Sequence, residues 1–103
     1  MASPPNVLTV DVEEWFHICG VGGPLAPANW PNLPSRVEVT TNRLLELFDR
    51  TGARATFFVL GYVADRYPRV IERIVQAGHH VGSHGHMHSR VYKLSPAAFE
   101  ADL

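Results

Sequence analysis

The chain has 103 residues, of which 46% are hydrophobic and 18% charged, and its formal net charge is -1. This composition is that of one folded domain and argues against a disordered chain, a basic nucleic-acid-binding surface and an anionic-membrane-binding surface. The single cysteine, Cys19, excludes an internal disulfide and a cysteine-rich zinc site. No apolar stretch approaches the ~20 residues of a transmembrane helix, and the first residues lack the basic segment of a secretory signal, so we expect a cytoplasmic protein without a transmembrane segment.

The N-terminal half begins with an apolar, β-rich run at 7–12, which predicts a buried strand. Residues 20–34 contain three glycines and four prolines, and we expect a long loop without regular structure there. Ser35 and Glu38 have the spacing of a capping box, which predicts the start of a helix. Its apolar face consists of Val37, Thr41, Leu44, Leu45 and Phe48, and Gly52 ends it in a left-handed cap.

The C-terminal half continues this alternation of strands and helices. A continuous apolar run at 55–60 predicts a strand buried on both faces of a parallel sheet. A helix should follow from Pro68 to Gly78, after a helical turn or loop at 62–67. A third strand is expected at 80–83, and the pair Ser95 and Pro96 predicts a last helix at 97–103.

The predicted fold class is α/β, with three βα units of a parallel sheet. Three strands can neither close a barrel nor cover both edges of an open sheet. The last predicted helix also reaches Leu103 without a capping residue. We therefore expect residues 1–103 to be the N-terminal portion of a larger α/β domain.

Polar side chains follow the first and third predicted strands, whose carboxyl ends meet at one edge of a parallel sheet. Because side chains alternate along a strand, Asp11 and Glu13 should share one face and Glu14 the other. His84 and His88 are four residues apart, so on a helical turn their rings would lie side by side.

Glu13, His84 and His88 would together supply the two histidines and one carboxylate of a catalytic zinc site. The same ligand types also suit cobalt, nickel and iron. Asp11 would remain unliganded beside them, free to accept a proton from the attacking water. Hydrolysis of an unactivated amide or ester at neutral pH requires such an activated water.

The other conspicuous side chains have simpler explanations. We expect His79, His80 and His86 to be structural or surface residues. Cys19 is expected to be a small buried hydrophobe, and its proximity in sequence to His17 does not make a nucleophile and base pair.

Three aromatic side chains, Trp15, Phe16 and Trp30, flank the first carboxylates and the glycine-proline loop. They are either core residues or a surface on which a sugar ring could stack. We therefore name Trp15 and Trp30 as candidate substrate-binding residues.

Three ordered motifs resemble polysaccharide deacetylases with a NodB homology domain, the carbohydrate esterase family 4 type. They are LTVDVEEWF at 8–16, RATFFVLG at 54–61 and HVGSHGHMH at 80–88. The segment DVEEWFH, together with SHGHMHS and LSP further along the chain, is similar to the sequences of the subfamily found beside exosortase and exopolysaccharide loci.

The resemblance implies a distorted (β/α) barrel with fewer than eight strands and a metal-dependent removal of N-acetyl groups from N-acetylglucosamine-type polysaccharide. It makes Asp11 the general base and His84 and His88 metal ligands. The third ligand is open between Glu13 and Glu14, and strand alternation favours Glu13.

In this family later motifs supply an arginine that orients the base, the acetyl pocket and a histidine that acts as general acid. We expect these motifs beyond Leu103, so we expect poor turnover from residues 1–103 alone. Two alternatives are an inert, metal-stapled glycan-binding or assembly module and a related hydrolase of cyclic amides or imides.

Overall fold

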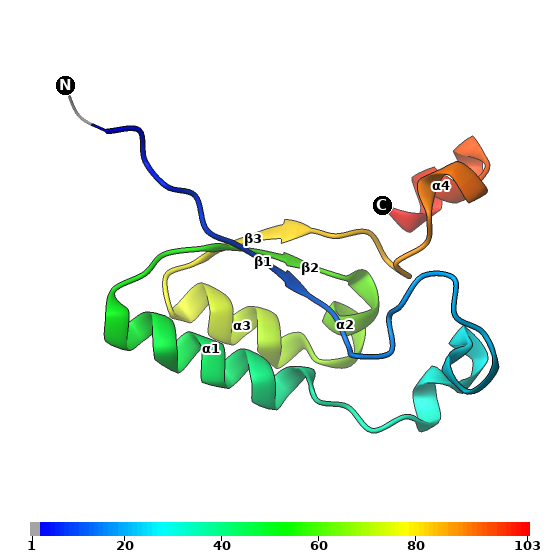
Figure 1. Cartoon of the computed structure of the whole chain (residues 1–103), viewed down its shortest axis with the longest axis horizontal. Coiled ribbons are helices and arrows are strands. Elements are labelled where there is room, and N and C mark those ends of the chain that lie inside the picture. The colour runs from blue at the N-terminus through cyan, green and yellow to red at the C-terminus, as the bar shows by residue number, and fades with distance from the viewer. Residues whose placement is uncertain (1–2) are drawn as a thin grey trace.

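The computed structural model describes residues 3–103, so Met1 and Ala2, part of the segment inspected for a secretory signal, lie outside the described residues. Strands β1 (Thr9–Val12), β2 (Thr56–Val59) and β3 (His80–Ser83) form a parallel sheet in the order β1-β2-β3 (Figure 1). This confirms the predicted parallel α/β class. All three carboxyl ends therefore lie at the same edge.

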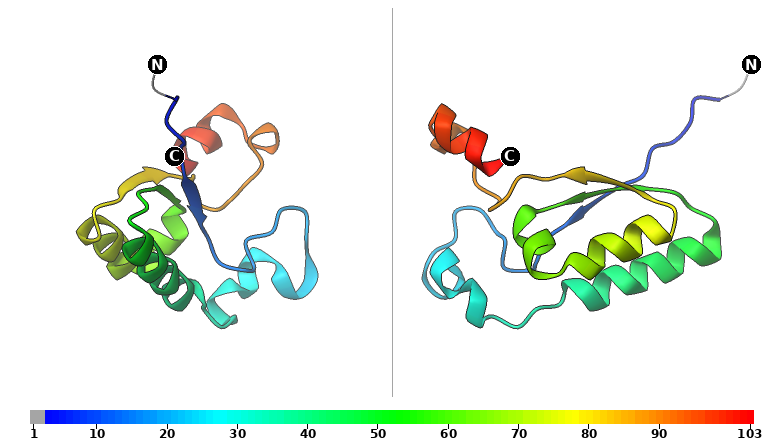
Figure 2. Two further views of the ribbon diagram at one scale, coloured as in Figure 1. Left: turned by 60° about the vertical axis from the view of Figure 1, so that its left-hand side comes forward. Right: turned by 180° about the vertical axis from the view of Figure 1, so that it is seen from behind.

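Helices connect the strands and pack on one face of the sheet. They are α1 (Val37–Thr51), α2 (Gly61–Arg66) and α3 (Pro68–Gln76), and α4 (Pro96–Asp102) ends the described chain. Figures 1 and 2 show α1 and α3 side by side beneath the sheet, with α4 beyond its carboxyl edge. No helix within residues 3–103 is long and apolar enough to cross a membrane.

The core lies between the sheet and these helices. Phe57 and Val59 of β2 are buried there with Phe48 of α1 and Ile74 of α3. Phe58 on the opposite face of β2 is only partly buried. The expectation that β2 is buried on both faces is therefore wrong for the described residues, because the helices cover one face only.

The predicted start of α1 is correct to within two residues, but the predicted capping box is wrong. The cap residue is Arg36, and no side chain of the box caps the helix. Instead the buried carboxylate of Glu14 accepts hydrogen bonds from the amides of Arg36 (3.0 Å) and Val37 (3.3 Å) and from the hydroxyl of Ser35. Glu14 thus ties the end of β1 to the start of α1, satisfying amides that a helix start leaves free. At the other end Gly52 has φ +70°, which confirms the left-handed cap.

Replacing Glu14 with alanine should lower the free energy of unfolding by about 2–3 kcal/mol, since it leaves buried donors without a charged acceptor. Glu38, the residue that a capping box would require, is the matched control. Glu38→Ala should change the free energy of unfolding by less than about 0.5 kcal/mol. Urea unfolding of both variants measures the difference, and equal losses would contradict the cap.

The glycine-proline segment is more regular than expected. It contains two short 3-10 helices, η1 (Gly23–Leu25) and η2 (Pro27–Asn32), each with a proline in its first turn. The indole of Trp30 donates to the carbonyl of Leu25 (3.0 Å), and the Asn29 amide donates to that of Gly23 (3.1 Å). The many glycines and prolines are incompatible with a long helix in this segment. They still allow short 3-10 helices that side-chain hydrogen bonds stabilise.

Candidate metal centre

The carboxylates after β1 divide between the two sides of the chain, as strand alternation predicts. The side chains of Asp11 and Glu13 lie near His84, which follows β3, whereas Glu14 is buried against α1. On the other side of the site, the amide of His84 donates to the carbonyl of Val59 (3.1 Å). This bond continues the β2–β3 ladder by one residue and fixes where His84 leaves the sheet.

Three side-chain atoms converge at this edge: Oε2 of Glu13 and the Nε2 atoms of His84 and His88. All three lie within 4.8 Å of one another. Oε2 of Glu13 is 3.0 Å from Nε2 of His88 and 3.7 Å from Nε2 of His84. Ligand atoms about 2.0–2.1 Å from a tetrahedral zinc lie about 3.4 Å apart, so the spacing suits a shared cation.

The hydrogen-bonding state of these atoms provides an independent test of fit. Oε2 of Glu13 and Nε2 of His84 are inaccessible to solvent, and neither has a hydrogen-bond partner within residues 3–103. Leaving buried polar atoms unpaired is unfavourable. A divalent cation would satisfy both, and their imidazole and carboxylate chemistry matches zinc and its neighbours. The residues therefore fit a metal ion.

Asp11 lies beside this group and outside it. Its Oδ2 is 3.9 Å from Nε2 of His84, and its side chain is 56% exposed. A carboxylate in that position can reach a water at the site without being one of the converging ligands.

The loop that carries the histidines is not the helical turn that we assumed from their spacing. Gly85 and His88 have φ angles of +76° and +58°, so the chain between His84 and His88 bends instead of forming a helical turn. Amides at the start of α2 hold the loop: Gly61 donates to the carbonyl of Gly85 (2.8 Å) and Tyr62 to that of His86 (3.1 Å). The rings of His84 and His88 still lie 5.2 Å apart, but a fixed loop rather than helical periodicity brings them together.

The carboxylate of Asp102 in α4 fixes the other side of this loop. It accepts from the amides of His86 (3.3 Å) and Met87 (3.1 Å). The loop of the histidine pair is thus held by the start of α2 on one side and by α4 on the other.

The other three histidines in this part of the chain, His79, His80 and His86, point elsewhere, as predicted. His86 faces Asp65 of α2 at 3.8 Å. His79 is buried beside Phe57, where its Nδ1 accepts from the amide of Ala55 (3.1 Å). His80 is exposed at the start of β3.

The two candidate substrate-binding tryptophans lie in different surroundings. Trp30 is only 5% exposed and packs with Phe16 and Tyr62 around the His17 ring. Trp15 is 43% exposed, and its indole donates to the carbonyl of Pro34 (2.9 Å) in a groove beside the start of α1. Neither ring lies among the converging ligands, and sugar stacking remains a prediction for both.

His17 is buried in this aromatic cluster and links it to β1. Its Nδ1 accepts a hydrogen bond from the amide of Glu14 (2.8 Å), so the ring is neutral there. The pKa of His17 is lowered from 6.5 to about 4, mainly by burial; the charge of Glu14 opposes this shift, and His88 contributes to it.

Lowering the pH from 7 to 5.5 should therefore destabilise the fold through His17, because the unfolded chain takes up a proton that the folded chain refuses. The stabilisation is complete above pH 6.5 and is lost as the pH falls toward 4. Between pH 7 and pH 5.5, the free energy of unfolding should fall by on the order of 1 kcal/mol more in the native protein than in His17→Gln. Glutamine keeps a hydrogen-bond acceptor at this position but does not titrate. Urea unfolding at both pH values measures this difference, and equal losses in the two proteins would contradict the assignment.

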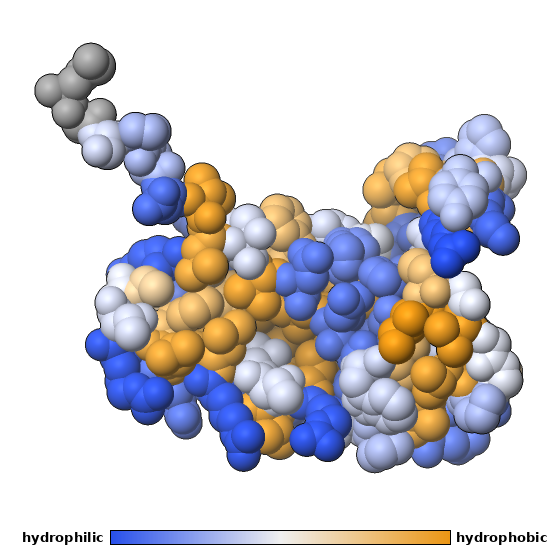
Figure 3. Space-filling view, viewed as in Figure 1, coloured by the Kyte–Doolittle hydropathy of each residue, from blue (hydrophilic) through white to orange (hydrophobic). Residues whose placement is uncertain are grey.

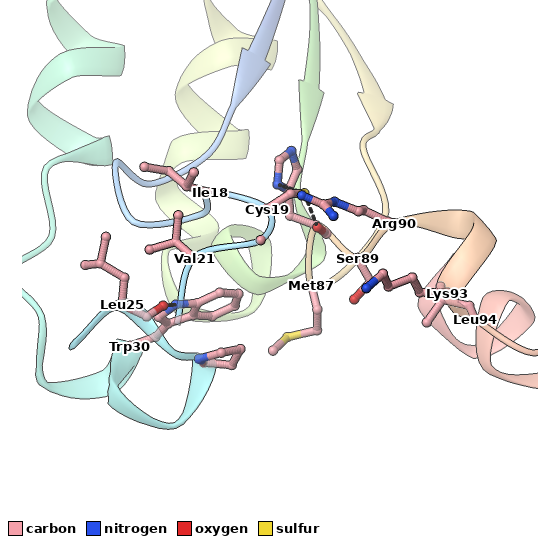
Figure 4. A pocket seen from close by; sticks show the side chains of 13 residues that line it. Ile18, Cys19, Val21, Leu25, Trp30, Met87, Ser89, Arg90, Lys93 and Leu94 are labelled. Atoms are coloured by element: carbon pink, nitrogen blue, oxygen red, sulfur yellow. Dashed lines mark hydrogen bonds between the residues drawn. The ribbon is translucent and has the colours of Figure 1, made fainter. Parts of the chain in front are cut away.

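Cys19 is the residue near the site that sequence reasoning missed. Its sulfur lies 3.5 Å from Nδ1 of His88 and 3.2 Å from the His88 carbonyl oxygen. Figure 4 shows it beside Arg90, at the edge of a cavity of about 330 Å³ between the loops after β1 and β3. Cys19 is 69 residues from His88, and no spacing rule connects them.

Comparisons with known proteins agree with this architecture. The family model described as polysaccharide deacetylase matches residues 29–103, which include both site histidines but neither Asp11 nor Glu13. A peptidoglycan-N-acetylglucosamine deacetylase of Bacillus cereus is 33% identical over 55 residues, covering 53% of this chain and 20% of its own length. A chitin deacetylase of Arthroderma benhamiae is 36% identical over 67 residues, covering 61% and 18%.

The structure of peptidoglycan deacetylase PdaC from Bacillus subtilis superposes with a TM-score of 0.59 at 28% identity, covering 86% of this chain and 33% of that one. The chain thus spans a third or less of the length of these relatives. The matched fold is the NodB type of (β/α) barrel. With the model match extending over most of its residues, the chain belongs to the polysaccharide deacetylase family.

Proposed function

We propose that this chain carries the metal-binding part of an enzyme that hydrolyses the N-acetyl groups of N-acetylglucosamine-type polysaccharide. The observation that carries the proposal is the convergence of Glu13, His84 and His88 with Asp11 beside them. Relatives named as peptidoglycan and chitin deacetylases support the choice of substrate class.

Glu13, His84 and His88 would hold the metal, and the hydrogen bonds of Glu14 to the start of α1 support the choice of Glu13 over Glu14. When bound, a divalent metal makes water more acidic and polarises the acetyl carbonyl. Zinc is our first choice from the ligand set, with cobalt, nickel or iron as alternatives.

Asp11 would accept the proton of the attacking water. Its carboxylate is close to His84 yet largely exposed, so it can contact a substrate that approaches from the carboxyl ends of the strands. The acetyl carbon then loses its bond to the sugar nitrogen, and the leaving amine takes up a proton. We propose that the donor of this proton belongs to a segment outside residues 3–103.

The open side of the sheet supports that proposal. Within residues 3–103, β1 and β3 each pair on one side only. A groove between β1 and α1 is lined by apolar side chains such as Val10 and Leu44 together with polar ones such as Asp11, and Figure 3 shows hydrophobic surface along this side of the molecule. We propose that residues 1–103 are the N-terminal portion of the barrel and that later strands cover these surfaces. The similarity to the exosortase-associated subfamily stays a prediction.

Acetate release from chitooligosaccharide by the whole protein, with and without a chelator, tests the function. We expect release that the chelator abolishes and Zn²⁺ restores. Metal-dependent glycan binding without acetate release would instead identify an inert module. Turnover confined to small cyclic amides or imides would identify the related hydrolase.

A further inference from the structure

We propose that Cys19 is a positioning residue that fixes the His88 imidazole so that Nε2 points at Glu13. The proposal rests on the proposed function, since it assigns Cys19 a task at the same metal centre. The sulfur is not itself a ligand in this arrangement, because it lies on the side of the ring opposite to the converging atoms.

The contacts of Cys19 define this task. Its sulfur contacts two atoms of His88, Nδ1 (3.5 Å) and the carbonyl oxygen (3.2 Å). The far nitrogen of the same ring, Nε2, is 3.0 Å from Oε2 of Glu13. One nitrogen of the imidazole therefore contacts Cys19, and the other faces the converging atoms.

The proton arrangement follows from the donors available. A thiol has one proton, and the shorter contact places it on the His88 carbonyl, with the sulfur left as an acceptor for Nδ1–H. Protonation of Nδ1 leaves the lone pair on Nε2, the form a metal requires. Histidine ligands are commonly oriented by a carboxylate or a carbonyl in this way, and here a thiol takes that place.

The backbone gives His88 a second reason to need support. Its φ of +58° is in the left-handed region, which is uncommon for a residue with a side chain. The hydrogen bond from Cys19 to the His88 carbonyl stabilises that conformation. Cys19 thus fixes both the ring and the peptide that carries it.

The loop that carries Cys19 has contacts that do not involve His88. The amide of Ile18 donates to the carbonyl of Phe16 (2.9 Å), and the amide of His17 donates to the backbone carbonyl of Glu14 (3.0 Å). At Gly20, φ is +77°, and a Cβ there would collide with the Arg90 guanidinium, so the loop packs closely on Arg90 (Figure 4). These turns support the position of the sulfur in addition to its contacts with His88.

The test compares Cys19→Ala and Cys19→Ser in the full chain, with Ile18→Ala as the matched control. Ile18 neighbours Cys19 and lines the same cavity, but its side chain is 52% exposed. The first readout is affinity for Co²⁺, followed by its absorption spectrum. The second is the His88 tautomer in the metal-free protein, read from ring ¹⁵N shifts.

We expect Cys19→Ala to weaken Co²⁺ binding about 10- to 100-fold and to mix the two His88 tautomers. Cys19→Ser retains a donor and an acceptor and should restore most of the affinity, and Ile18→Ala should match the native protein. If the native protein binds no Co²⁺, the proposed function fails, while the tautomer readout still decides the role of Cys19. Native Co²⁺ affinity and an unchanged tautomer in Cys19→Ala would overturn the inference, as would a thiolate-to-cobalt absorption band. If Cys19→Ala does not fold, a fully mixed tautomer in Cys19→Ser would overturn it.

Discussion

Replacing either His84 or His88 with alanine is expected to lower the affinity for Zn²⁺ or Co²⁺ by more than about a hundredfold. Each histidine supplies one of three converging atoms, and removing a direct ligand should cost more than the 10- to 100-fold typical of a residue that only supports one. Titration with Co²⁺, followed by absorption, and competition with a zinc-binding dye measure the two affinities.

His86→Ala is the control, because His86 lies between the two in sequence yet faces Asp65 on α2. Its affinity should stay within about threefold of the native value. If His86→Ala lost the metal as completely as His84→Ala, a general disturbance of the loop would explain both results. If His84→Ala bound normally, the proposed ligand set would be wrong.

The fold was largely predictable because its signals are local. Apolar runs, proline positions and left-handed glycines placed the strands at 7–12, 55–60 and 80–83 and the helices between them within a few residues. The capping box failed because a distant carboxylate, Glu14, competes successfully for the same amides. A spacing rule within one segment contains no information about a partner 22 residues away.

The convergence of Glu13, His84 and His88 was predictable from the sequence, but the way the chain brings them together was not. Strand alternation separated Glu13 from Glu14, and the common edge of a parallel sheet brought Glu13 to the histidines. The helical turn assumed for His84 and His88 is wrong, since loop conformations depend on tertiary hydrogen bonds. Cys19 was missed for the same reason, because only the folded chain brings it to His88.

Asp11→Asn is expected to reduce acetate release from chitooligosaccharide about 10²- to 10⁴-fold in the whole protein while leaving metal affinity nearly unchanged. Asparagine keeps the shape of the side chain but cannot accept a proton from water. Asp11 lies outside the three converging atoms, 3.9 Å from His84, so its amide would not remove a ligand. Rate and Co²⁺ affinity, measured on the same preparation, separate the two effects.

Two comparisons make this test of Asp11 specific. Asp49→Asn removes one negative charge from an exposed position on α1 and should retain the native rate. Glu13→Gln should lose both rate and metal, since it alters one of the proposed ligand atoms. Asp11→Asn should lose rate, unlike Asp49→Asn, and should keep the metal, unlike Glu13→Gln. The proposed base is needed for the reaction and not for binding the cation. If it lost the metal as Glu13→Gln does, Asp11 would be a ligand, and a native rate would show that another group takes the proton.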